Sequence, residues 1–282
     1  MKTKGNFITV KPQDELVAKY IECYYFHTSD DPGFNSRFTF YPNYKHGLTI
    51  YKNSDVRFSD TSSIVTPAKA EKYIALYSVN TNQSFNVSLT GCFNKIGVVF
   101  NPIGINHFMN KPVSDVFTPA FAEFTYFEPG LQTAANAAFA ETDITLKGSY
   151  LDAFFKSAYC GFDEPVIKKA VQEILNSNGS VKVEELSDHT GVNRKTLLRL
   201  FKKHLCTSVE EYKKLVMFRN ALNYSQHAGN DATLTDVALY SLYYDQAHYI
   251  KHFKAFTKQS PKELLSKLTQ LDNRDIYWRF EE

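Results

Sequence analysis

Residues 183–204 read VEELSDHTGVNRKTLLRLFKKH, and this stretch decides the fold of the C-terminal half. Its pattern predicts a short helix over Val183–Thr190, a turn at Gly191 and a second helix over Asn193–His204. Asparagine is favoured at the start of a helix, where its side chain accepts a hydrogen bond from the backbone. The apolar residues of the second helix recur at helical spacing, so one face should pack inward and the other should meet solvent.

A similar pattern occurs again 52 residues later in the chain. When the sequence is shifted by 52 positions, Ser208 aligns with Ser260 and Glu211 aligns with Glu263. Each Ser-x-x-Glu stretch has the form of a capping box, which opens a helix. An internal repeat predicts two copies of one supersecondary unit. Each copy should contain a helix, a tight turn, a longer basic helix and a helix that starts at serine.

This arrangement is that of a helix-turn-helix, whose second helix enters the major groove of DNA. Two units in one chain would read two groove segments roughly 34 Å apart without a dimer. The charge distribution agrees with this interpretation: residues 194–258 contain 11 basic and 5 acidic side chains, although the net charge of the whole chain is only +2. A local basic surplus is typical of a phosphate-binding surface.

The first half of the chain has the pattern of short strands that end at turn residues. These segments are Phe38–Phe40, Leu48–Tyr51, Ile74–Tyr77, Phe85–Leu89 and Ile96–Phe100. A helix is expected early, over Asp14–Tyr24, and further helices are expected at about 130–160. The sequence therefore predicts an α+β fold, with a mostly-β small barrel and flanking helices over residues 1–162 and an all-α domain over residues 163–282.

Composition excludes several classes of protein. The 282 residues are 43% hydrophobic and 22% charged, which is ordinary for a globular chain. We expect neither a membrane span nor a secretory signal, and hence a cytoplasmic protein, because no long apolar run occurs. The four cysteines lie far apart and form no C-x-x-C pair, so neither a zinc ribbon nor a redox site is supported.

About residues 166–266 resemble the C-terminal DNA-binding domain of the AraC/XylS family of transcription regulators. The resemblance is carried by residues 186–203, by residues 237–254 and by Ser260-Pro261. The chain departs from the family pattern at Cys206, where glycine is usual, at Val209, where proline is usual, and at Leu242-Tyr243, where Gly-Phe is usual. Because leucine does not easily adopt the positive φ that glycine permits, the second turn is expected to be reshaped.

More loosely, the N-terminal half resembles the cupin-like sensor domains that precede this module, mainly at residues 96–104. The resemblance implies a one-component transcription regulator, an activator by family habit, with helices 130–160 as a packing or dimerisation region. Its implied partners are double-stranded DNA, RNA polymerase, a small-molecule effector and a second copy of the chain. No cofactor is expected, and residues 269–282 lie beyond the resemblance with no role assigned.

The resemblance also places the DNA-contacting side chains on two recognition helices. Those expected to read bases are Lys195, Leu198 and Arg199 in the first helix and Gln246, Ala247, Ile250 and Lys251 in the second. Arginine suits guanine, glutamine suits adenine, and apolar side chains suit the thymine methyl group. Phosphate contacts, which fix the register, are expected from Arg194, Thr196 and Lys202. The alternative for each exposed side chain is that it simply meets water.

Two other function classes remain open beside the regulator. One is a cupin-type metal-binding or enzymatic protein, and the other is an interaction scaffold whose helical domain no longer reads DNA specifically. His27, His46 and His107 are isolated, without an H-x-H pair, so we expect neither a metal site nor an enzyme. An apolar pocket or a filled barrel would equally explain the N-terminal aromatic residues, which are Phe38, Phe40, Tyr41, Tyr51, Phe58, Tyr77, Phe85 and Phe100.

Overall fold

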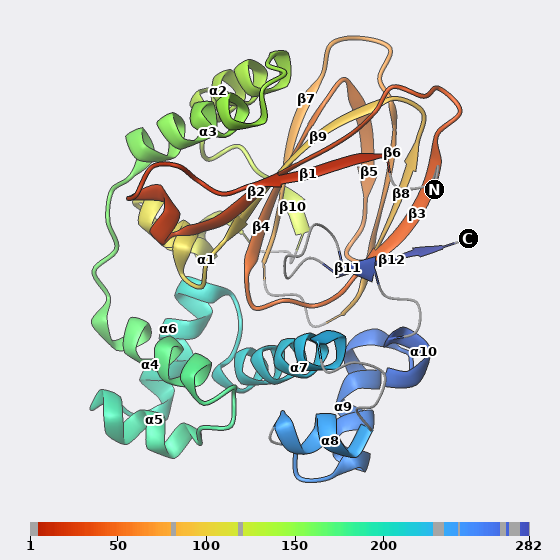
Figure 1. Cartoon of the computed structure of the whole chain (residues 1–282). Coiled ribbons are helices and arrows are strands. Elements are labelled where there is room, and N and C mark those ends of the chain that lie inside the picture. The colour runs from red at the N-terminus through yellow and green to blue at the C-terminus, as the bar shows by residue number, and fades with distance from the viewer. Residues whose placement is uncertain are drawn as a thin grey trace.

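A computed structural model describes residues 5–79, 83–117, 121–227, 234–241, 243–265, 269–270 and 277–281 of the chain. The N-terminal part is built on two six-stranded sheets, and the C-terminal part is helical (Figure 1). The predicted α+β fold class is confirmed, with a mostly-β first half. The expectation that residues 163–282 are all-α is wrong at their end, because residues 269–270 and 277–281 form strands that pair with the N-terminal part. Within the described residues, none of the helices is both long and apolar enough to cross a membrane.

The first sheet carries strands from the first 123 residues of the chain. In spatial order they are β1 (Asn6–Val10), β2 (Ile21–Ser29), β9 (Phe93–Phe100), β4 (His46–Lys52), β7 (Tyr73–Ser78) and β10 (Phe121–Glu123). All neighbours in this sheet are antiparallel. Side chains of β2 and β9 are buried on both faces, because the second sheet covers one face and helices cover the other.

The second sheet combines strands from both ends of the chain. In spatial order they are β11 (Thr269–Gln270), β12 (Tyr277–Glu281), β3 (Asn35–Phe40), β8 (Phe85–Thr90), β6 (Ser62–Pro67) and β5 (Ser54–Phe58). Strand β12 runs antiparallel to β3, with Trp278 opposite Phe40 (Figure 1). The C-terminal segment, which had no role in the sequence analysis, is therefore part of the N-terminal sheet.

Helices cover the outer face of the first sheet. These are α2 (Gly130–Ala140), α3 (Ile144–Ala158), the short α1 (Val113–Val116) and two 3₁₀ turns, Val17–Lys19 and Gly104–Phe108. Leu131, Leu151 and Phe155 pack there against Tyr24 and Val98. The helices expected at 130–160 are thus confirmed.

The helix expected over Asp14–Tyr24 is wrong. Only one 3₁₀ turn forms, at Val17–Lys19, and β2 begins at Ile21. Asp14 accepts backbone hydrogen bonds from Leu16 and Val17, which closes the turn. The following residues 23–27 are all buried, and a strand between two layers can bury both of its faces, whereas a helix at this position would bury only one stripe.

The C-terminal part contains seven helices within the described residues. They are α4 (Pro165–Asn176), α5 (Val183–Thr190), α6 (Arg194–Leu205), α7 (Val209–His227), α8 (Leu234–Tyr240), α9 (Gln246–Thr257) and α10 (Pro261–Leu265). One apolar cluster gathers α4, α5, α6 and the start of α7, and another gathers the rest of α7 with α8, α9 and α10. Helix α7 therefore joins two helical units, one at each of its ends (Figure 1).

Candidate nucleic-acid interface

The first helical unit has the geometry of a helix-turn-helix. Helix α5 ends at Gly191, whose φ of 70° gives the sharp turn that glycine adopts without strain. The Asn193 side chain then accepts a hydrogen bond from the Thr196 amide at 2.9 Å and starts α6. Leu197 and Phe201 are fully buried, which turns the opposite face of α6 outward.

The second unit repeats this construction at α8 and α9. Asp245 caps α9 by accepting a hydrogen bond from the His248 amide at 2.7 Å. Tyr249 and Phe253 are fully buried beneath it. The expectation of a reshaped turn at Leu242-Tyr243 is untested, because Leu242 lies outside the described residues. Tyr243 is buried, and its hydroxyl lies 2.6 Å from His252 Nδ1.

The 52-residue repeat extends to details of the backbone. The two recognition helices end at Cys206 and Lys258, which are 52 positions apart and both left-handed, with φ of 54° and 58°. Both predicted capping boxes form: the Ser208 amide donates to Glu211 Oε2 at 3.0 Å, and the Ser260 amide donates to Glu263 Oε2 at 2.8 Å. Cys206 thus adopts the conformation for which glycine is usual.

The outward face of α6 carries the three side chains predicted to read bases. Lys195, Leu198 and Arg199 are all exposed, and Leu198 is 43% exposed although it is apolar. A basic face with one exposed leucine has the chemistry needed for guanine and thymine edges in the major groove.

The predicted phosphate contacts flank this face and have carboxylate neighbours. Arg194 pairs with Glu184 of α5, and Lys202 Nζ lies 3.8 Å from a Glu211 oxygen. Both cations remain more than half exposed, so a phosphate could replace either carboxylate at little cost. Thr196 is half-buried at the first turn of α6.

On α9, three of the four predicted base-reading side chains are exposed, namely Gln246, Ala247 and Lys251. Gln246 Oε1 lies 3.4 Å from the Thr235 hydroxyl of α8. Ile250 is half-buried and packs against the apolar cluster of this unit, so less of it is available to DNA.

The helical units also contact the N-terminal part. At the end of α6, the His204 carbonyl accepts a hydrogen bond from Asn106 Nδ2 at 3.2 Å, and Cys206 packs on the core outside the first sheet. In the second unit, the Phe256 carbonyl accepts a hydrogen bond from Ser84 at 3.0 Å. Both recognition helices therefore contact the N-terminal part near their C-terminal ends.

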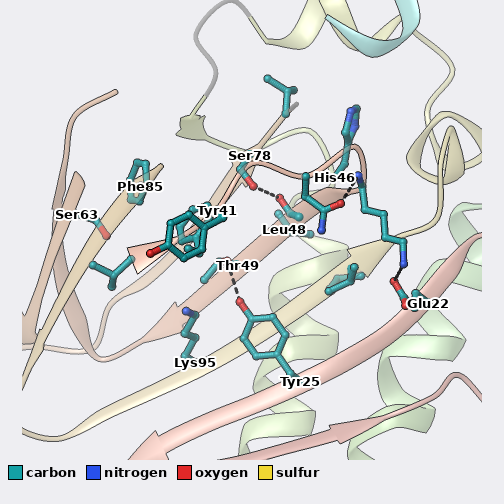
Figure 2. A pocket seen from close by; sticks show the side chains of 18 of the residues that line it. Glu22, Tyr25, Tyr41, His46, Leu48, Thr49, Ser63, Ser78, Phe85 and Lys95 are labelled. Carbon is teal, nitrogen blue, oxygen red and sulfur yellow. Dashed lines mark hydrogen bonds and ion pairs between the residues drawn. The ribbon is translucent and has the colours of Figure 1, made fainter. Parts of the chain in front are cut away.

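A cavity of about 130 Å³ lies between the two sheets, close to the roughly 150 Å³ that admits benzene in a protein core. Figure 2 shows part of its lining, including Lys95 of β9 and Tyr25 of the neighbouring β2. Of the predicted pocket aromatics, Phe40, Tyr41, Tyr51 and Phe85 line it. The others do not: Phe38, Tyr77 and Phe100 are buried in the cores, and Phe58 is 39% exposed.

Sequence reasoning missed two buried cations of this cavity, Lys95 and Arg219. Lys95 is 4% exposed, and burial lowers the pKa of its amine to about 7. Arg219 is 3% exposed and reaches the same cavity from α7, the helix that joins the two units. The available signal was a basic residue inside an apolar run, Phe93–Phe100 for Lys95 and Leu215–Leu222 for Arg219.

The three N-terminal histidines lie in separate places. His27 meets the edge of Phe93, the Tyr77 hydroxyl lies 2.5 Å from His46 Nδ1, and His107 stacks on Tyr20. In the part of the chain that the structure describes, no three His, Cys, Asp or Glu side chains gather as metal ligands. The expected absence of metal and of enzymatic activity stays a prediction.

Comparison with solved structures returns matches at low identity. ToxT from Vibrio cholerae is 10% identical over 94% of this chain and 98% of its own, with a TM-score of 0.47. The C-terminal domain of AraT from Geobacillus stearothermophilus is 18% identical over 39% of this chain and 92% of its own, with a TM-score of 0.35. Curated proteins give no match.

Two family models match separate parts of the chain. Residues 8–118 match a domain of unknown function (DUF6597). Residues 186–267 match a helix-turn-helix domain, and this range contains both turns, both recognition helices and both capping boxes described above. The C-terminal part of the chain therefore contains a helix-turn-helix domain, which agrees with its resemblance to the AraC/XylS regulators.

Proposed function

We propose that this chain is a sequence-specific transcription regulator that reads DNA with α6 and α9 and adjusts that reading to a ligand in the cavity between the sheets. The observation that carries the proposal is the doubled unit. Each of its two recognition helices begins at a residue whose side chain caps the helix and ends at a residue with a left-handed φ. Their outward faces carry Lys195, Arg199, Gln246 and Lys251. The division into residues 1–162 and 163–282 is part of this proposal, except that strands β11 and β12 belong to the N-terminal sheet.

Within this proposal, Arg199 reads a guanine, and Leu198, Ala247 and the exposed part of Ile250 touch thymine methyl groups. Arg194, Thr196 and Lys202 hold phosphates beside the groove. Because α6 and α9 are joined by one helix, α7, the two half-sites should have a fixed spacing of about one helical turn.

The link between ligand and DNA runs through α7. Arg219 belongs to that helix and lines the cavity, so an occupant would touch the segment that joins both units. A ligand that prefers one arrangement of α7 shifts the population competent for DNA. Activation through RNA polymerase, a homodimer and a cytoplasmic location stay predictions.

The test is selection of bound sequences from a random duplex pool at physiological salt with the full chain. Two enriched blocks about one turn apart are expected, and Arg199→Ala should weaken the selected site by about 1–3 kcal/mol and relax the preference at one position. Arg57→Ala is the matched control, because it removes an exposed arginine from β5.

Three results would contradict parts of the proposal. No enriched sequence, with and without added ligands, would favour a scaffold without specific readout. One enriched block would remove α9 from base reading. Equal losses for Arg199→Ala on selected and random DNA would assign Arg199 to phosphate.

A further inference from the structure

Lys95 lies where a strand between two sheets ordinarily carries an apolar side chain. It is 4% exposed, and its Nζ lies 5.3 Å from the ring centre of Tyr25, 5.5 Å from that of Phe38 and 5.6 Å from that of Tyr51. Three aromatic faces therefore surround the amine at cation–π distance. The same side chain lines the cavity between the sheets (Figure 2).

The described lining of the cavity carries more positive than negative charge. Among the described residues that line it, Glu22 is the one carboxylate, and its Oε2 lies 2.6 Å from Lys45 Nζ. Arg219 adds a further positive charge on the same lining. Burial lowers the pKa of Lys95 to about 7, so a much larger share of this amine is neutral at neutral pH than of an exposed lysine.

A neutral, desolvated lysine is the usual amine nucleophile toward carbonyl carbon. We propose that Lys95 captures a small aldehyde with an aromatic or apolar body as a reversible imine in the cavity. Imine formation at Lys95 does not depend on the proposed function. Only the role of the adduct as an effector of DNA binding rests on that function.

The step balances without an oxidant or a reductant. The Nζ lone pair attacks the carbonyl carbon and forms the C–N bond, and the oxygen takes up a proton to give a carbinolamine. A proton from solvent then joins the hydroxyl group, the C–O bond breaks, and the oxygen leaves as water with one hydrogen from the amine and this one from solvent. The imine nitrogen keeps the second amine hydrogen and carries the positive charge. The protonated imine is a cation, and the rings of Tyr25, Phe38 and Tyr51 stabilise it as they do the ammonium group.

The remaining lining fits the body of such a ligand. Leu48, Phe85 and Val98 supply apolar surface, and the cavity volume of about 130 Å³ suits a single ring. Thr49 and Ser63 supply hydroxyl groups that can hydrogen-bond to the departing oxygen. Benzaldehyde is therefore the probe of choice.

The experiment treats the full chain with benzaldehyde and cyanoborohydride, which reduces an imine to a stable benzyl amine, and maps the labelled lysines by mass spectrometry. Exposed Lys69 is the internal control. At pH 7 we expect Lys95 to be labelled at least about tenfold faster than Lys69, because the neutral fraction at pKa 7 exceeds that of an ordinary lysine roughly 10³-fold. The ratio should fall as the pH approaches 10.

Mapping on the unaltered chain makes the result independent of whether a variant folds. Label on Lys95 that is lost in Lys95→Arg supports the proposal. Labelling of Lys95 no faster than Lys69 overturns it. A second result also overturns the proposal: benzoate raises the melting temperature while benzaldehyde forms no adduct on Lys95. The cavity would then be a binding site for carboxylic acids.

The DNA selection separates the two proposals. If Lys95 is labelled but the chain selects no DNA sequence, the imine proposal is supported and the proposed regulator function is wrong. If the chain selects a DNA sequence but Lys95 is not labelled, the proposed regulator function is supported and the imine proposal is wrong.

Discussion

Replacing Lys95 by methionine should stabilise the protein, and the gain should depend on pH. Burial lowers the pKa of this amine from 10.5 to about 7. In the folded state the neutral amine is preferred, so the cost of burying the ammonium is complete below pH 7 and disappears as the pH rises toward 10.5. Methionine has a similar length and no charge, so it removes that cost without a large change of volume.

The magnitude follows from the shift. Each pKa unit corresponds to 1.36 kcal/mol, so a shift of about 3.5 units costs about 5 kcal/mol at pH 6 and about 1.4 kcal/mol at pH 9.5. The three rings around Nζ return part of this, about 1–2 kcal/mol, because they attract the ammonium. We therefore expect Lys95→Met to raise the free energy of unfolding by about 3–4 kcal/mol at pH 6.

The assay is urea unfolding of the full chain at pH 6 and pH 9.5, with Lys69→Met as the matched control on an exposed lysine. The control should change stability by less than about 0.5 kcal/mol at either pH. A gain of equal size at both pH values would show that Lys95 is not buried as an ammonium. A loss of stability at pH 6 would show that its amine makes an interaction worth more than its desolvation.

Three further substitutions test the fold. Phe201→Ala should lower the free energy of unfolding by about 3–5 kcal/mol in thermal or urea melts, because the Phe201 side chain is fully buried on the inner face of α6. A loss of less than about 1 kcal/mol would show that Phe201 is not part of the core. Gly97→Ala should destabilise by about 1–3 kcal/mol or more, since its Cβ would lie 1.9 Å from the ring of Tyr25, and a chain as stable as the original would contradict that close approach. Asp245→Ala should cost about 1 kcal/mol through the lost cap on the His248 amide and weaken DNA binding; an unchanged melt would argue against the cap.

The helical half was predictable because its signals are local. Asn193 starts α6, the two Ser-x-x-Glu boxes start α7 and α10, and the apolar stripe sets the inward face. Local hydrogen bonds and helical periodicity are properties of a few adjacent residues. The same reasoning failed at β2, since a strand buried on both faces has no alternation to distinguish it from a helix.

The cavity was only partly predictable, because its lining comes from segments far apart in the chain. Four of its aromatic residues were anticipated as pocket residues from composition. Lys95 and Arg219 were not, since one lies on β9 and the other on α7, and nothing in the sequence places them on the same cavity. Long-range packing decides such sites.

Strand β12 can join the second sheet only long after the other strands of the N-terminal part have been synthesised. Phe40 of β3 pairs with Trp278, about 240 residues later. At about 5–20 residues per second a ribosome needs roughly 10–50 seconds to cover that distance. During this time the edge of β3 has no β12 beside it, and an unpaired edge is a template for pairing with other chains. Chains that stop before residue 277 should therefore be prone to aggregation.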